Sequence, residues 1–250
     1  MLAFAHGYAM DHRMWDQQVA HLRDRYRCIT VDARGHGQTG GTAPFTQWDV
    51  ADDLIALLHG LGISRAVLVG MSQGGFVVSR AAVRAPELVA GLVIVSSTAR
   101  AYSDEQRAEV NQLIDAWSAG MDDALADVLE SVIIGAPSQA NEVWKERWKR
   151  WDAAQLRNAF VAVADREDFT DRLPEITAPT LIIHGDQDNA FNLDEEARPH
   201  ADGLPHGRLT VIDGAGHGVN MTHPARVNVE LDAFLAEPAV VDRLNESART

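Results

Sequence analysis

Six short apolar runs, separated by longer stretches with helical periodicity, set the organisation of the chain. They are LAFAH (2–6), RCITVD (27–32), AVLVG (66–70), GLVIVSS (91–97), TLIIHG (180–185) and RLTVID (208–213). Runs that are apolar at successive positions are typical of parallel strands covered on both faces. Between the second and third runs, Thr46 and Asp49 form a capping-box pattern ahead of apolar residues at helical spacing. The alternation predicts a doubly wound, mostly parallel α/β sheet, with functional residues at the carboxyl ends of the strands.

The alternation of strand and helix stops between about residues 100 and 174. Several helical patterns follow one another there, and the prolines of DRLPEITAPT mark the return to the sheet. We therefore predict a core formed by residues 1–99 and 175–250, with residues 100–174 as an inserted helical lid.

Composition narrows the classes of function. The 250 residues are 46% hydrophobic, enough for one sizeable core. The formal net charge of −14 opposes binding to nucleic acid, and no run approaches the roughly 20 apolar residues of a membrane span. The start of the chain lacks a signal-peptide pattern, and the single cysteine, Cys28, has no partner for an internal disulfide. These features predict a cytoplasmic protein that binds neither nucleic acid nor a membrane.

The strongest chemical signal is GMSQGG at residues 70–75, between a predicted strand and a predicted helix. Gly-x-Ser-x-Gly in this setting is the pattern of a nucleophile elbow, which holds Ser72 on a tight turn. Glycines at positions 70 and 74 let the neighbouring backbones pass closely. The pattern alone is weak evidence, but its place between a strand and a helix makes it specific.

A serine nucleophile needs a histidine base, and that base needs an acid that fixes its tautomer. Asp186 and Asp188 follow the strand TLIIHG, and His217 lies in a glycine-rich loop after the next strand. A lone loop histidine is usually just solvated. The order Ser, Asp, His, each after its own strand, favours a catalytic triad.

Together these segments resemble the α/β-hydrolase family over nearly the whole chain. HGYAMDHRMW (6–15) is similar to the family's oxyanion loop, DARGHGQT (32–39) to the turn after its next strand, and GMSQGG to its elbow. The resemblance implies Ser72 as nucleophile, His217 as base and Asp188 as the orienting acid, with Asp186 as the alternative. It gives His36, in the turn, no catalytic role.

The same resemblance implies an oxyanion hole made by the backbone amides of Tyr8 and Gln73. No metal or organic cofactor is required for such a site. Because the nucleophile is serine and not aspartate, the haloalkane dehalogenase and epoxide hydrolase branches are disfavoured.

The segment VWKERWKRW (143–151) sets three tryptophans among basic residues. On a helix, positions 144, 148 and 151 fall within about 60° of one another. The family carries a helical lid at this place, so we assign Trp144, Trp148 and Trp151 to the substrate pocket. The alternative is that they pack the lid onto the core, and a membrane or nucleic-acid contact ranks behind both.

The resemblance implies a serine hydrolase that cleaves carboxylic esters or lactones, similar to the esterase and enol-lactonase branches. Its partner is then a small ester or lactone. A carbon–carbon bond hydrolase or a perhydrolase would share every motif residue. A small-molecule receptor with the same fold and little turnover is a further alternative.

One departure concerns the start of the sheet. Family members carry two further strands ahead of the oxyanion loop, whereas here Met1 lies five residues before His6. The strand that contains Cys28 is then expected at an exposed sheet edge. We expect a start further upstream. The alternatives are that the edge is covered by a partner, such as a second copy in a homodimer, or by a rearranged segment of the chain.

Overall fold

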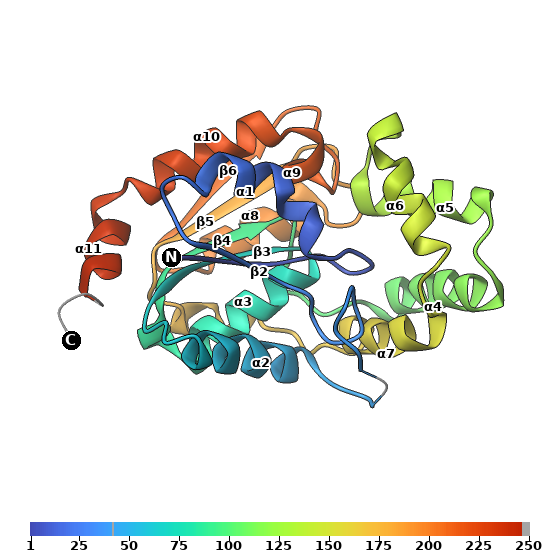
Figure 1. Cartoon of the computed structure of the whole chain (residues 1–250), viewed down its shortest axis with the longest axis horizontal. Helices are drawn as coiled ribbons and strands as arrows, with labels where there is room; N and C mark the ends of the chain where they lie inside the picture. The colour runs from blue at the N-terminus through green and yellow to red at the C-terminus, as the bar shows by residue number, and fades with distance from the viewer. Residues whose placement is uncertain (42, 247–250) are drawn as a thin grey trace.

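The structure, a computed structural model, describes residues 1–41 and 43–246 and is built on one six-stranded sheet (Figure 1). The strand order is β2-β1-β3-β4-β5-β6, and every neighbouring pair is parallel. The strands are β1 (Leu2–Ala5), β2 (Cys28–Val31), β3 (Ala66–Met71), β4 (Val89–Val95), β5 (Thr180–Gly185) and β6 (Gly207–Ile212). All six predicted strands are confirmed, as is the doubly wound α/β class.

Helices cover both faces of this sheet. In the first half of the chain they are η1 (His12–Trp15), α1 (Asp16–Leu22), α2 (Gln47–Gly60), α3 (Gln73–Arg84) and η2 (Pro86–Leu88). After β5 they are η6 (Leu193–Ala197), α8 (Arg198–Asp202), α9 (Val219–Thr222), α10 (Pro224–Leu235) and α11 (Pro238–Glu246). The predicted capping box is present, since Thr46 and Asp49 bond reciprocally at the start of α2. None of the described helices is both long and apolar enough to cross a membrane.

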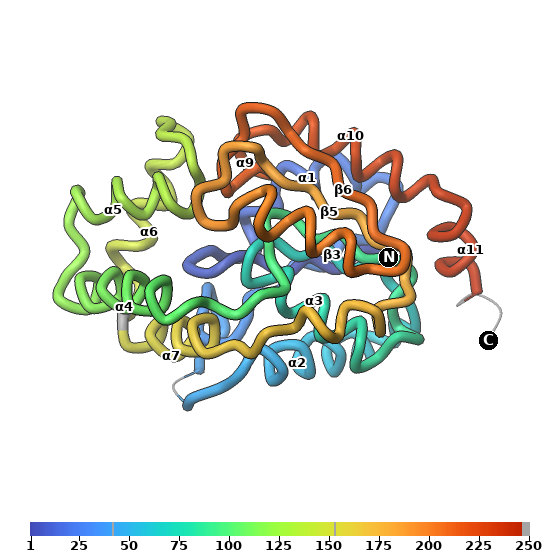
Figure 2. The backbone as a smooth tube through the Cα atoms, turned by 180° about the vertical axis from the view of Figure 1, so that it is seen from behind, coloured from blue at the N-terminus to red at the C-terminus, as the bar shows by residue number. Residues whose placement is uncertain are grey.

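Side chains of alternate strand residues pack into two separate cores, one on each face of the sheet. Leu2 and Phe4 point into the core that includes residues of α1 and α10, whereas Ala3 and Ala5 point into the core under α2 and α3. Figures 1 and 2 show the same layers from opposite sides, with α1, α9 and α10 above the sheet and α2 and α3 below it. Burial on both faces explains why the strands read as continuous apolar runs.

The strand that contains Cys28 lies at one end of the sheet, as expected. All four residues of β2 are only half-buried, unlike the fully buried β1 beside it. Its neighbour in the sheet is β1.

Between β4 and β5 the described chain is helical and contains no strand, in agreement with the sequence pattern. It holds α4 (Asp104–Ala119), α5 (Asp123–Leu129), the π-turn η3 (Glu130–Ile134), η4 (Gln139–Asn141), α6 (Glu142–Trp148), α7 (Ala153–Ala164) and η5 (Thr170–Glu175). This helical region gathers at one end of the sheet (Figure 1).

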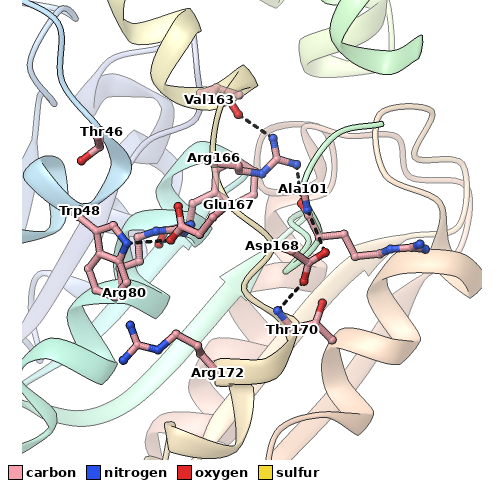
Figure 3. Close-up of polar contacts among 12 residues, drawn as sticks. Thr46, Trp48, Arg80, Ala101, Val163, Arg166, Glu167, Asp168, Thr170 and Arg172 are labelled. Carbon is pink, nitrogen blue, oxygen red and sulfur yellow. Dashed lines mark hydrogen bonds and ion pairs between the residues drawn. The ribbon is translucent and has the colours of Figure 1, made fainter. Parts of the chain in front are cut away.

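The two ends of the helical region are joined to each other (Figure 3). The buried Arg166 guanidinium donates to the carbonyls of Val163 and Arg100, both at 2.8 Å. Asp168 accepts from the Ala101 amide at 3.3 Å and from the Thr170 amide at 2.9 Å. The segment that leaves α7 is thereby held against the segment that enters α4.

Glu167, which lies between Arg166 and Asp168, connects this junction to the helices below the sheet. Glu167 accepts from Trp48 Nε1 at 2.7 Å and pairs with the guanidinium of Arg80 at 2.9 Å (Figure 3). Arg80 is 1% exposed and stacks 4.9 Å from the ring of Phe169. A buried guanidinium is costly without a partner, so Glu167 and the ring stabilise it.

Candidate active site

The turn between β3 and α3 holds Ser72 in a strained conformation. Its φ of 51° and ψ of −114° lie outside the regions that non-glycine residues usually adopt. Two hydrogen bonds to its own backbone hold it there: the Ser72 amide donates to Val95 O at 2.9 Å, and the Ser97 hydroxyl donates to Ser72 O at 2.8 Å. This is the geometry of a nucleophile elbow.

Two glycines are required by contacts of this turn. A Cβ at Gly70 would lie 2.2 Å from Gly74 O, and a Cβ at Gly74 would lie 2.1 Å from Ala5 O. Both clashes involve backbone atoms, which no rotamer change relieves. The sequence motif is therefore explained by close packing of β1, β3 and α3.

The loop after β6 brings His217 onto the loop after β5. His217 Nδ1 lies 3.0 and 2.9 Å from the two carboxylate oxygens of Asp188. This contact places the Nδ1 proton toward Asp188 and leaves Nε2 free to accept a proton. Burial opposes ionisation of Asp188, but the contacts with His217, His184 and the Phe191 amide together outweigh it and lower the pKa of Asp188.

Of the two candidate acids, the geometry pairs Asp188 and not Asp186 with His217. Asp186 accepts from the Gly214 amide at 2.6 Å and so braces the histidine loop. Asp188 itself is held by the amides of Ala190 and Phe191, at 2.8 and 3.1 Å.

A further histidine, His184 on β5, supports the same loop. Its Nε2–H donates to Phe191 O at 2.8 Å, and the same nitrogen lies 3.4 Å from Asp188 Oδ2. It is fully buried, and burial lowers its pKa, which favours the neutral ring. Sequence reasoning missed this residue, although it immediately precedes the GDQD segment.

Ser72 and His217 line one cavity of about 380 Å³ between the sheet and the helical region. Its walls are mostly apolar and include Leu113, Ile114, Trp117, Ile133, Phe160 and Val163, all from the segment between β4 and β5. An apolar cavity with a few polar groups at its reactive end is typical of a small-molecule site.

The two predicted oxyanion amides both lie near the elbow. Tyr8 lines the cavity, and Gln73 directly follows Ser72 at the start of α3. Across the described parts of the chain, no acceptor takes a hydrogen bond from the backbone amide of either residue. Gln73 itself lines a second cavity, of about 290 Å³.

Neutral histidines pack behind the loop after β1. His6 Nδ1–H donates to Gly7 O at 2.8 Å, and its Nε2 accepts from the Ala33 amide at 3.0 Å. His36 packs 4.9 Å from the His6 ring and 5.7 Å from the Tyr8 ring. Burial lowers the pKa of His36 to about 3, so it stays neutral. These contacts agree with a structural position for His36.

The assignment of Trp144, Trp148 and Trp151 to the substrate pocket is wrong for this structure. None of the three belongs to the described lining of the cavity that contains Ser72. Trp148 is fully buried, and its Nε1–H donates to Ala9 O at 2.7 Å. Trp144 and Trp148 belong to the core on the α1 side, so they pack the helical region onto the core.

The three tryptophans do not share one helical face because the helix ends before Trp151. Because α6 stops at Trp148, Trp151 leaves the expected helical face and packs edge-on against His36 at 6.2 Å. Trp117, on α4, lines the cavity instead.

Three of the four basic residues of this segment form ion pairs within the region, and the fourth stacks on a tryptophan ring. Lys145 lies 2.8, 3.0 and 2.9 Å from carboxylates of Asp127, Glu130 and Glu142. Arg147 stacks over Trp144 at 4.5 Å. The cluster therefore holds neighbouring helices together.

The helical region also contacts the histidine loop directly. The Gly218 amide donates to Ile134 O at 2.9 Å. A Cβ at Gly135 would lie 2.9 Å from Gly216 Cα and from His217 N. The end of the π-turn is thus in backbone contact with the loop that carries His217.

One group has a composition that suits a metal ion. Ligand atoms of Asp11, His12 and Asp32 lie within 4.8 Å of one another. The Asp32 carboxylate already accepts from the His12 amide and the Gln38 amide, at 2.8 and 2.9 Å. These bonds account for the cluster as a brace between the loops after β1 and β2.

Comparisons with known proteins agree with this architecture. Residues 2–224 match the family model described as the alpha/beta hydrolase fold. A non-heme chloroperoxidase of Streptomyces lividans is 30% identical, over 94% of this chain and 91% of its own. A bifunctional esterase/perhydrolase of Acinetobacter calcoaceticus is 28% identical, over 94% and 91%.

Among solved structures, the enol-lactonase from Burkholderia xenovorans LB400 superposes with a TM-score of 0.84 at 25% identity. The match covers 94% of this chain and 91% of that one. The resemblance noted in the sequence is thereby confirmed at the level of family and fold, and the chain belongs to the α/β-hydrolase family.

Proposed function

We propose that this protein is a serine hydrolase that cleaves carboxylic esters or lactones through an acyl-serine intermediate. The observation that carries the proposal is the pairing of His217 with Asp188, because His217 lines the same cavity as Ser72. The strained turn supports it, as do the amides of Tyr8 and Gln73, which donate to no acceptor among the residues that the structure describes.

In the proposed reaction, Ser72 Oγ attacks the carbonyl carbon while His217 Nε2 takes its proton. The amides of Tyr8 and Gln73 stabilise the oxyanion, and each such donor is typically worth about 10²–10³ in rate. His217 then protonates the departing alcohol. Water, deprotonated by the same nitrogen, releases the acid and restores Ser72.

The test is multiple turnover on a panel of aryl esters and small lactones of graded acyl length. We expect steady turnover that falls by about 10⁴-fold or more in Ser72→Ala. Ser64→Ala is the matched control, because Ser64 is exposed and does not line the cavity that holds Ser72. Folded protein that shows one turnover or none would favour a receptor.

A second candidate, perhydrolysis, is favoured by the names of two relatives, a chloroperoxidase and an esterase/perhydrolase. In that reaction hydrogen peroxide takes the place of water on the acyl-serine, and a peracid leaves instead of an acid. Peracid formation from an ester and peroxide, measured against ester hydrolysis in the same protein, separates the two reactions. A carbon–carbon bond hydrolase would instead be recognised by its products.

A further inference from the structure

One face of α4 forms a long wall of the cavity. The residues of α4 on the cavity are Gln106, Glu109, Val110, Leu113, Ile114 and Trp117. Their spacing of three and four places them on one side of the helix. Glu109 is exposed and Trp117 is 3% exposed, so the wall runs from a polar opening to an apolar interior.

The charge on this wall has one sign. Glu109 contributes a carboxylate, and no lysine or arginine belongs to the cavity lining among the residues that the structure describes. The whole chain carries a formal net charge of −14, so the field around the opening repels anions.

A buried cation does lie behind the wall, but it is already engaged. Arg166 stacks 4.0 Å from the ring of Tyr102, which separates it from the cavity. Its guanidinium donates to two backbone carbonyls, and its charge also interacts with the carboxyl group of Glu196. Arg166 is therefore not placed to pair with a carboxylate of a substrate.

The apolar interior of the cavity also disfavours a charged group on the substrate. A carboxylate that enters an apolar cavity loses its hydration, and only a paired cation repays that loss. Both the acyl and the alcohol part of an ester must share this cavity with Ser72 and His217, so the penalty applies to either part.

We infer that the site is selective for uncharged esters with an apolar acyl or alcohol part and rejects esters that carry an additional carboxylate. Glu109 at the opening is the residue that sets this selectivity. The inference rests on the proposed function and narrows it, since it disfavours carboxylate-bearing lactones as substrates.

The experiment compares two esters of matched length, 4-nitrophenyl heptanoate and the mono-4-nitrophenyl ester of adipic acid. We expect kcat/KM for the neutral ester to exceed that for the anionic ester by at least about tenfold at low salt. The ratio should shrink as ionic strength rises, because salt screens the charge of an exposed carboxylate.

Two charge-reversal variants test whether Glu109 causes the selectivity. Glu109→Lys is expected to reduce the ratio by about tenfold, whereas Glu105→Lys should change it less than about threefold. Glu105 lies on the same helix, is exposed and does not line the cavity, so both variants change the net charge equally. Long-range steering alone would move both variants alike.

The possible outcomes test the selectivity for uncharged esters separately from the hydrolase activity on which it rests. Turnover of both esters that depends on Ser72, with a ratio near one, overturns the inference and leaves the hydrolase proposal standing. Equal shifts in Glu109→Lys and Glu105→Lys overturn the role of Glu109. No turnover of either ester that depends on Ser72 overturns both.

Discussion

The sheet and the helical region between β4 and β5 hold their functional residues in different ways. At the end of the sheet, backbone packs on backbone, as where Gly70 meets Gly74 O and Gly185 meets Ala215 O. In the helical region, side-chain contacts hold the parts together: Lys145 joins α6 to the π-turn, and Trp148 attaches α6 to the loop after β1. The sheet thus fixes the reactive groups, while side-chain packing shapes the cavity.

The largest expected effect tests the acid at the end of the sheet. Asp188→Asn should lower kcat by about 10⁴-fold, because an amide can donate to Nδ1 and favour the wrong tautomer of His217. Asp186→Asn is the control, since the geometry gives Asp186 only a contact to the histidine loop. Steady-state kinetics on a neutral ester measure both. A larger loss in Asp186→Asn would exchange the two assignments.

The next prediction concerns the place where the two regions touch. Gly135→Ala adds a Cβ that lies 2.9 Å from Gly216 Cα, at a φ of 94°. We expect kcat to fall about 10- to 100-fold with a smaller change in KM, since a displacement of about 1 Å can cost 10²-fold.

Gly120→Ala is the matched control for this variant. Gly120 also has a positive φ, of 142°, in a region at least as unfavourable for alanine, but its Cβ would meet nothing within 4 Å. We expect it to lower stability and to leave kcat of the folded protein unchanged. Equal losses of kcat in Gly135→Ala and Gly120→Ala would contradict the expected effect of the π-turn on His217.

A smaller effect distinguishes packing from substrate contact among the tryptophans. Trp148→Phe should lower the free energy of unfolding by about 1–3 kcal/mol, because Ala9 O loses its buried donor. It should leave the acyl-length preference unchanged, whereas Trp117→Ala should extend that preference to longer chains. Urea unfolding and the ester panel measure the two effects. A changed length profile in Trp148→Phe alone would restore the original pocket assignment.

The smallest effect is a dependence of stability on pH. Burial raises the pKa of Glu196 from 4.5 to about 7, so the folded chain keeps a proton that the unfolded chain releases between these values. Stability therefore falls as the pH rises through this window.

After allowance for solvent screening of this partly solvated group, we expect Glu196 to cost about 1 kcal/mol at pH 8. Glu196→Gln should remove that part of the slope, and the exposed Glu195→Gln should not. Melting temperatures from pH 5 to 8 measure it, and parallel curves for wild type and Glu196→Gln would contradict the assignment.

The same contrast explains what the sequence could and could not predict. Ser72 and the pair of Asp188 and His217 follow strand ends, where local motifs and parallel topology determine position. The cavity wall depends on how α4, the π-turn and α7 pack, which no local motif predicts. The periodicity around Trp144 also did not reveal that α6 ends at Trp148. Trp117 carried no local signal, since a tryptophan on an amphipathic helix is usually part of a core.

The acyl-serine intermediate is the central claim, and its direct measurement is the mass of the protein quenched during turnover of a neutral ester. The account predicts a gain equal to the acyl group, located on the peptide that contains Ser72 and absent from Ser72→Ala. Turnover that persists in Ser72→Ala, with no acyl group on the wild-type protein at any quench time, would contradict it.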